Sequence, residues 1–282
     1  MLGLLGVGKP GHLIGTEAIL GLAVCLMFTV AFLVVESRVP EPILPLGLFG
    51  SRTFITTTVC LFLSGVAMFG VISFLPLFVQ AVLGATAVQA GSVLTPISLS
   101  WVSGSTIGGR LLNRFGYRTL AVAGMVCLTG GYLLLTRLQA GSSLRYAGAS
   151  GVVLGLGMGL ITVTTVVAVQ SMASPDQIGV VSTLPFFFRN IGATIGVAIM
   201  GTILNAHVVG TGLALGGGEE AFQAVPALLR GQMAQGIRAA FFFGLAAVAV
   251  GIPLSLMVPD LSPIRPGAEA ATRAAPSAAP MD

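Results

Sequence analysis

One arginine lies far from either end of an apolar stretch, where a charged side chain is costly. Arg189 comes eleven residues after Ile178, the start of the stretch at 178–205. At 1.5 Å per helical residue this places it about 16 Å deep in a hydrocarbon core about 30 Å thick. A central arginine costs about 2.5–3.5 kcal/mol even on a lenient membrane-insertion scale, so it must face protein or water. Arg189 therefore either lines a polar cavity or bonds a neighbouring carbonyl and holds helices together.

Other side chains could complete such a cavity. Asn190 adds an amide beside the guanidinium, and Phe186 adds an aromatic face that can bind a cationic or apolar compound. In the stretch at 88–109, Thr95 and Ser98 lie close to one helical face. Hydroxyl groups in lipid either bond back to their own helix or line a wet cavity, and both readings stay open.

A segment rich in glycine and arginine, GGRLLNRFGYR at 108–118, joins two apolar stretches. A tight turn between helices needs glycine where φ is positive. Its guanidinium groups can bind helix C-terminal carbonyls or lipid phosphates. On composition alone, an ordinary arginine-rich loop also explains this segment.

The elements that must position these residues are membrane-spanning helices. Of the 282 residues, 55% are hydrophobic and only 8% are charged, against about 25% charged residues in soluble domains. The bilayer is therefore the expected solvent, and a spanning helix needs about 20 mostly apolar residues. We expect an all-α membrane protein with about seven transmembrane helices, at 13–35, 55–82, 88–109, 118–137, 146–172, 178–205 and 238–258.

Glycines recur at intervals of four residues within several of these stretches. Small residues let helix backbones approach closely in lipid, where no hydrophobic effect drives helices together. We expect these glycines to pack helices rather than to contact a ligand: Gly151, Gly155 and Gly159 in one stretch, and Gly192 and Gly196 in the next.

The sequence lacks the residues that several kinds of chemistry require. Its three cysteines lie in apolar stretches without CxxC or Cys/His spacing, and its two histidines lie at or beyond the ends of such stretches. We therefore expect no metal site, no cofactor and no catalytic residue. The net charge of +4 comes from thirteen basic residues that form no patch, so nucleic acid is not an expected partner.

The segment at 108–118 resembles the signature G-x-L-a-D-R-x-G-x-R of the major facilitator superfamily, which follows the second helix of each six-helix half. Gly109, Leu111, Arg114, Gly116 and Arg118 match that signature. The resemblance implies that this loop takes part in a conformational switch.

The loop departs from the signature at one position. Asn113 stands where the family has an aspartate that helps lock the outward-open state. The resemblance therefore implies a weaker latch in this chain, which is typical of the second half of these proteins.

Longer segments resemble one branch of this family. The stretches FLPLFVQAVLGATAVQAGSVLTP at 74–96 and VQSMASPDQIGVVSTLPFFFRNIGATIGVAIMGTIL at 169–204 are similar to the C-terminal half of the fourteen-helix drug:proton antiporters. The lead-in FLVVESRVPEPILPLGLF at 32–49 is similar too. The resemblance covers about residues 13–260.

This resemblance implies a domain organisation. Residues 1–36 form an N-terminal lead and a single helix, and residues 37–53 a Pro-rich cytoplasmic linker. Residues 54–260 form the six-helix C-terminal bundle, and residues 261–282 a disordered cytoplasmic tail.

The distribution of basic residues favours an orientation in the inner (plasma) membrane. Cytoplasmic loops carry the excess of Lys and Arg. With the N-terminus outside and the C-terminus inside, the cytoplasmic set is Arg38, Arg52, Arg110, Arg114, Arg118, Arg265 and Arg273, and the external set is Lys9, Arg137, Arg145, Arg230 and Arg238. We expect this orientation.

The function implied is proton-driven efflux of hydrophobic, drug-like compounds by alternating access. All nine Asp and Glu residues fall in loops or near the ends of stretches, whereas proton coupling uses a titratable group within the membrane. We therefore expect an N-terminal half as partner, on the same full-length chain or as a separate subunit, besides the lipid bilayer, the small-molecule substrate and protons.

Three alternatives stay open. The chain is a non-transporting truncated fragment, a genuine half that assembles with another chain, or a seven-helix membrane receptor or enzyme. A receptor has no reason to carry Gly109, Arg114 and Gly116 at antiporter spacing, so the last reading is disfavoured.

Overall fold

The computed structural model of the chain describes residues 50–171, 178–208 and 227–258, together with eight residues between 23 and 35. Apart from short turns, these residues are helical, and the described part contains no strand. From residue 50 onward the described α-helices are α3 (Arg52–Ala81), α4 (Ala87–Ser92), α5 (Leu94–Thr136), α6 (Leu144–Gln170), α7 (Ile178–Val208) and α9 (Ala227–Leu256).

Five helices in the described part are long and apolar enough to cross a membrane: Arg52–Ala81, Ala87–Thr136, Leu144–Gln170, Val181–Val208 and Arg230–Leu256. They confirm the expectation of an all-α membrane protein. The expected number of seven lies partly outside the described residues, because only eight residues of the stretch at 13–35 are described, all of them helical.

The helix α5 is a hairpin rather than one long rod. Its backbone leaves helical geometry at Gly116, where φ is 77° and ψ is 169°. Before this residue the chain runs parallel to α6, because Ile97 lies beside Gly151 and, further along, Gly108 lies beside Leu160.

After Gly116 the second arm of α5 runs antiparallel to α6. Gly124 lies beside Ile161, and Gly131, further along the arm, lies beside the earlier residue Leu154. The two arms correspond to the separate stretches expected at 88–109 and 118–137.

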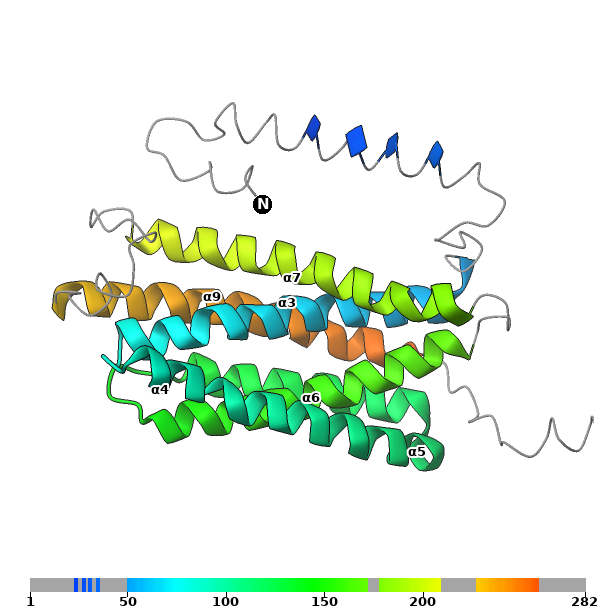
Figure 1. Ribbon diagram of the computed structural model, residues 1–282, viewed down its shortest axis with the longest axis horizontal. Coiled ribbons are helices and arrows are strands. Elements are labelled where there is room, and N and C mark those ends of the chain that lie inside the picture. The colour runs from blue at the N-terminus through cyan, green and yellow to red at the C-terminus, as the bar shows by residue number, and fades with distance from the viewer. Residues whose placement is uncertain are drawn as a thin grey trace, which may run out of the picture.

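The helices form two groups that lie side by side (Figure 1). One group contains α3, α7 and α9, and the other contains α6 and both arms of α5. Contacts of α9 with α5, and of α3 with α6, join the groups.

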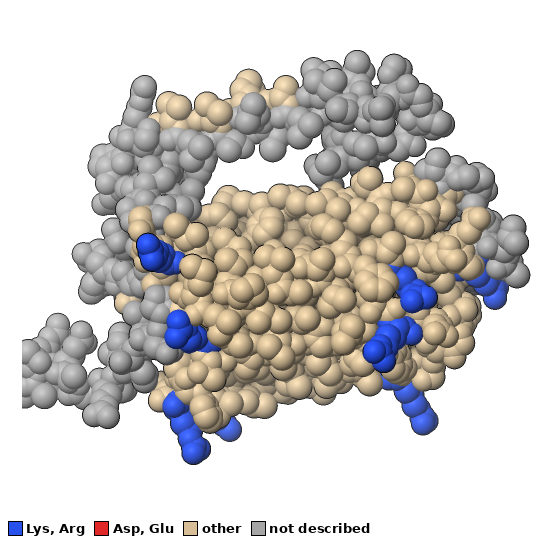
Figure 2. Space-filling model, turned by 180° about the vertical axis from the view of Figure 1, so that it is seen from behind, with Lys and Arg blue, Asp and Glu red and all other residues tan. Residues whose placement is uncertain are grey.

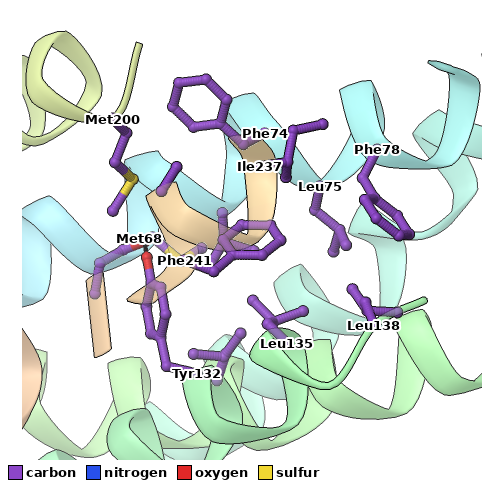
Figure 3. Packing of buried hydrophobic residues seen from close by; sticks show 14 of the residues in the cluster. Met68, Phe74, Leu75, Phe78, Tyr132, Leu135, Leu138, Met200, Ile237 and Phe241 are labelled. Carbon is purple, nitrogen blue, oxygen red and sulfur yellow. Dashed lines mark hydrogen bonds between the residues drawn. The ribbon is translucent and has the colours of Figure 1, made fainter. Parts of the chain in front are cut away.

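A buried core fills the region where the groups meet (Figure 3). The hydroxyl of Tyr132, on α5, donates a 2.6 Å hydrogen bond to the carbonyl oxygen of Ala67 on α3. The Tyr132 ring also packs edge-on against Phe241 of α9, with 6.3 Å between centroids. Because Tyr132 is fully buried, this bond satisfies a hydroxyl that would be costly to leave unpaired.

Arginines cap two helix ends. The last carbonyls of a helix have no donor within it. Arg118 Nε donates to the carbonyl oxygen of Leu256, the last residue of α9, over 2.7 Å. Arg238 Nε donates over 3.1 Å to that of Thr136, the last residue of α5. The two bonds tie α9 to α5, one at the last residue of α9 and the other at Arg238 within it.

On the face shown in Figure 2, the basic side chains lie toward the two ends of the bundle, and the surface between them carries no charge. Apart from Arg189, the described arginines divide evenly between the two ends of the bundle, with Arg52, Arg110, Arg114 and Arg118 toward one end and Arg137, Arg145, Arg230 and Arg238 toward the other. Orientation in the membrane therefore stays a prediction.

The last span begins earlier than expected. The helix α9 starts at Ala227, eleven residues before the predicted start of 238. The prediction placed a boundary at the polar residues Arg230 and Arg238, but the segment from Ala227 to Ile252 contains no proline to end a helix. The helix α3 begins at Arg52, close to the expected start at 55. The expected tail at 261–282 lies outside the described residues.

Candidate functional site

Close backbone contact between α3 and α7 holds the candidate site in position. A Cβ at Gly192 would overlap the backbone of Phe62, and one at Gly196 would lie 2.8 Å from the Cα of Val66. A Cβ at Gly65 would overlap the carbonyl of Arg189 itself. These contacts require glycine, and they hold the backbone that carries Arg189 directly against α3.

The Arg189 side chain lies between two aromatic rings. Its guanidinium carbon is 5.5 Å from the ring centroid of Trp101, on the first arm of α5. It is 5.1 Å from the centroid of Phe186, one turn earlier on α7. Both distances are within the range of cation–π attraction. The arginine therefore connects the two helix groups.

The guanidinium has no hydrogen-bond partner among the described residues. Arg189 is half-buried, and its Nε is buried without a partner. The described part of the chain contains neither Asp nor Glu, so it offers no carboxylate to this cation.

A second unpaired polar atom lies at the same depth. Gln170 Nε2, at the end of α6, donates to Ser182 Oγ, near the start of α7, over 2.9 Å. The two helices are antiparallel, so residues equally far from this bond, backward along α6 and forward along α7, lie at similar depth. Thr162 lies eight residues before Gln170 on α6, and Arg189 lies seven residues after Ser182 on α7. The Oγ1 of Thr162 is also buried without a partner.

The other predicted polar site residues form no hydrogen bond with the Arg189 side chain. Asn190 is exposed, and Thr194 Oγ1 donates to its carbonyl. Thr95 and Ser98 are exposed on α5, and Ser98 Oγ bonds back to Leu94 O at 3.3 Å.

Trp101 is the residue that the sequence reasoning missed. It is the chain's only tryptophan and lies one turn after Ser98 on the same arm of α5. A single amphipathic aromatic residue in the middle of a hydroxyl-rich span was the available signal.

The glycines of α6 lie against the first arm of α5. A Cβ at Gly155 would lie 3.0 Å from the backbone nitrogen of Trp101, and one at Gly159 would overlap the carbonyl oxygen of the same residue. Gly151 faces the side chain of Ile97. The backbone of Trp101 is thus held close to α6.

The described residues include no group of three or more His, Cys, Asp or Glu that could hold a metal ion. What the arrangement offers instead is a cation with two aromatic faces and exposed polar neighbours.

Comparison with known proteins decides the family. The sequence profile of the Major Facilitator Superfamily matches residues 6–197, which is more than half of the chain.

The chain belongs to the major facilitator superfamily.

Similar proteins include transporters of several bacteria. The chain is 40% identical over 190 residues to the multidrug transporter protein MdtP of Bacillus subtilis, a match that covers 67% of this chain and 35% of that protein. It is 32% identical over 176 residues to a tetracycline resistance determinant of Streptomyces rimosus, covering 61% of this chain and 50% of that protein. MdtP is a transporter and not an enzyme, and this chain, which belongs to the same family, is not an enzyme either.

A solved structure shares the fold. A bacterial homolog of the human lysosomal transporter Spinster, in an inward-facing and occupied conformation, superposes with a TM-score of 0.59 at 17% sequence identity. The match covers 75% of this chain and 50% of that one. The chain thus spans about a third of the length of MdtP and half of this structure.

The superfamily signature loop at 108–118 forms the turn of the α5 hairpin. Gly116 supplies the positive φ, and Arg118 is occupied in capping α9. Gly109 and Asn113 are exposed, as is Arg114, whose guanidinium lies 5.6 Å from the ring centroid of its neighbour Phe115. The loop therefore presents one amide, Asn113, and two arginines that form no hydrogen bond with a described residue, Arg110 and Arg114, at the surface.

Proposed function

We propose that this chain is the C-terminal half of a proton-driven exporter of hydrophobic, drug-like compounds that works by alternating access. The observation that carries the proposal is the 40% identity over 190 residues with a multidrug transporter protein. The tetracycline resistance determinant among the relatives supports the same class of compound.

The face around Arg189 supports a compound-binding role. Sites for small molecules are mostly apolar and aromatic, with a few polar groups that orient the ligand. Phe186, Phe187 and Ile195 are exposed on α7, and Leu99 and Val102 are exposed on α5. With Arg189, Asn190, Thr95 and Ser98 they would form one wall of a central cavity.

The other wall and the coupling groups would come from an N-terminal half. None of the described residues is Asp or Glu, so the described half has no carboxyl group that could carry protons within the membrane. Alternating access also needs a second six-helix bundle that rocks against the first. That half belongs either to the same full-length chain or to a separate subunit.

The signature loop would take part in the switch between the two open states. An aspartate at position 113 would bind a cation or a helix N-terminus through a charge-assisted hydrogen bond, and Asn113 offers only a neutral one, which is about half as strong. We therefore expect a weak latch on this side of the transporter.

An immunoblot and a dye assay test the proposal. An antibody to the tail at 264–282, applied to native membranes, separates a band near the calculated 28.6 kDa from one about twice that size, which would identify a longer transporter. Cells lacking the gene should accumulate more ethidium than the parent, and a protonophore should abolish the difference. Equal accumulation with and without the gene, across several cationic dyes, would contradict the proposed export.

The alternative is a truncated product that does not transport. It predicts the smaller band, no co-purifying membrane partner, and no change in dye accumulation when the gene is removed.

A further inference from the structure

The faces and the edge of the Arg189 guanidinium have different surroundings. The ring centroids of Trp101 and Phe186 lie 5.5 Å and 5.1 Å from its central carbon, Cζ. Its N–H groups form no hydrogen bond or ion pair with any described residue, and the Nε is buried. The cation is therefore held by two rings while its donors are left without an acceptor.

Aromatic rings cannot replace an acceptor. The N–H groups of a guanidinium lie in its plane, as a rigid fork. Cation–π attraction acts through the face of a ring and does not use those donors. The Nε donor is buried without an acceptor and pays its desolvation cost. The terminal nitrogens also lack an acceptor but are not buried, so an incoming acceptor can reach them.

The acceptor that suits such a fork best is a carboxylate. Two parallel N–H···O bonds to one carboxylate are among the strongest charge-assisted pairs in proteins. All Asp and Glu residues of the chain lie outside the described residues, so the described bundle presents the cation without its counter-charge.

We propose that Arg189, with Trp101 and Phe186, forms a carboxylate-binding position. The source of the carboxylate is either an aromatic compound that carries a free carboxylate and inserts beside the two rings, or a carboxylate side chain of the proposed N-terminal half. The inference rests on the proposed function, since it specifies a chemical group that the exporter's cavity accepts.

A purely structural arginine is the competing reading. In that case Arg189 only joins α7 to α5 through Trp101, and no anion binds. The two readings differ in ligand preference and in how a substitution changes stability.

The experiment uses matched dyes and the protein purified from native membranes with any partner that co-purifies. Rhodamine B carries a free carboxylate, and its ethyl ester has the same ring system without that charge. Binding of each dye is followed by fluorescence anisotropy for wild type, Arg189→Gln and Arg189→Lys. The exposed arginine at the start of α6 supplies the control, Arg145→Gln.

If the compound supplies the carboxylate, Arg189→Gln weakens binding of rhodamine B about tenfold, the effect of one charge-assisted hydrogen bond. Binding of the ester stays unchanged. Arg189→Lys retains part of the preference because it keeps the charge but not the fork. Arg145→Gln changes neither dye.

If the protein supplies the carboxylate, wild type shows no preference for the free acid. In the absence of dye, Arg189→Gln then lowers the melting temperature at pH 8, because it leaves an internal carboxylate unpaired. The difference from wild type closes toward about pH 4, where carboxyl groups protonate. The described residues of α3, α5 and α6 include no Asp, Glu or His, and His207 is near the far end of α7, so no described group near Arg189 titrates in that range.

The proposal is overturned if wild type shows no preference for the free acid and the stability difference does not depend on pH. Export of the ester would still test the proposed function separately, since the ester carries no carboxylate for Arg189 to bind.

Discussion

Substitution of Gly192 by alanine should separate close helix packing from helix propensity. On α7, a Cβ at Gly192 would lie 2.8 Å from the carbonyl carbon of Phe62 and 3.1 Å from its Cα, and closer still to the oxygen. These are backbone atoms, so α3 and α7 must move apart. We expect a cost of about 1–3 kcal/mol, as for overpacking of a core.

Gly201 on the same helix provides a matched control. A Cβ there would meet only the Phe74 ring, at 3.9 Å, which is an ordinary contact. Replacing a helical glycine by alanine gains about 1 kcal/mol of helix propensity. Gly201→Ala should therefore be neutral or stabilising, and Gly192→Ala should be less stable than it by about 1–4 kcal/mol.

The free energy of unfolding can be measured by titrating the purified chain from mild detergent into sodium dodecyl sulfate, with helical circular dichroism as the signal. Gly192→Ala should also shift the Arg189 backbone, because Gly65 and Gly192 belong to the same α3–α7 contact. Equal unfolding free energies for the two variants would refute the packing argument.

Two further substitutions test the turn and the core. Gly116→Ala should lower the free energy of unfolding by about 1–3 kcal/mol, because φ of 77° with ψ of 169° is essentially restricted to glycine. The control Gly109→Ala should not lower it, because its Cβ would meet only a side chain at 4.0 Å. The same unfolding titration checks both variants, and equal stability would argue against the turn geometry. Tyr132→Phe should lower the free energy of unfolding by about 1 kcal/mol, because it removes the hydrogen bond to Ala67. The control Tyr117→Phe removes no hydrogen bond to a described residue and should be as stable as wild type. A Tyr132→Phe variant as stable as wild type would show that the bond contributes nothing.

The helices could be read from the sequence because their causes are local. An apolar run of about 20 residues has few other ways to satisfy its backbone in lipid, and the described spans begin or end close to the expected residues. The early start of α9 at Ala227 was missed because Arg230 and Arg238 were taken to mark membrane boundaries. Arginine side chains can lie on a helix that extends beyond the apolar core, so charge alone does not end it.

The site was predictable only in part. The depth of Arg189 follows from counting residues along one helix, and it already requires a protein or water environment. Its contact with Trp101 could not be derived, because 88 positions separate the two residues and the register between α5 and α7 depends on how both pack against α3 and α6.

The sequence by itself determined the solvent, the approximate spans, the superfamily loop and the single deep cation, since each depends on composition or on spacing within one segment. Tertiary structure decided which ends meet, as in the bond from Arg118 to Leu256 across 138 positions. It also decided that Arg189 lies between two rings with its donors unpaired. The physical reason is that hydropathy acts residue by residue, whereas contacts between helices depend on the position and rotation of whole helices, which small residues such as Gly192 allow but do not specify.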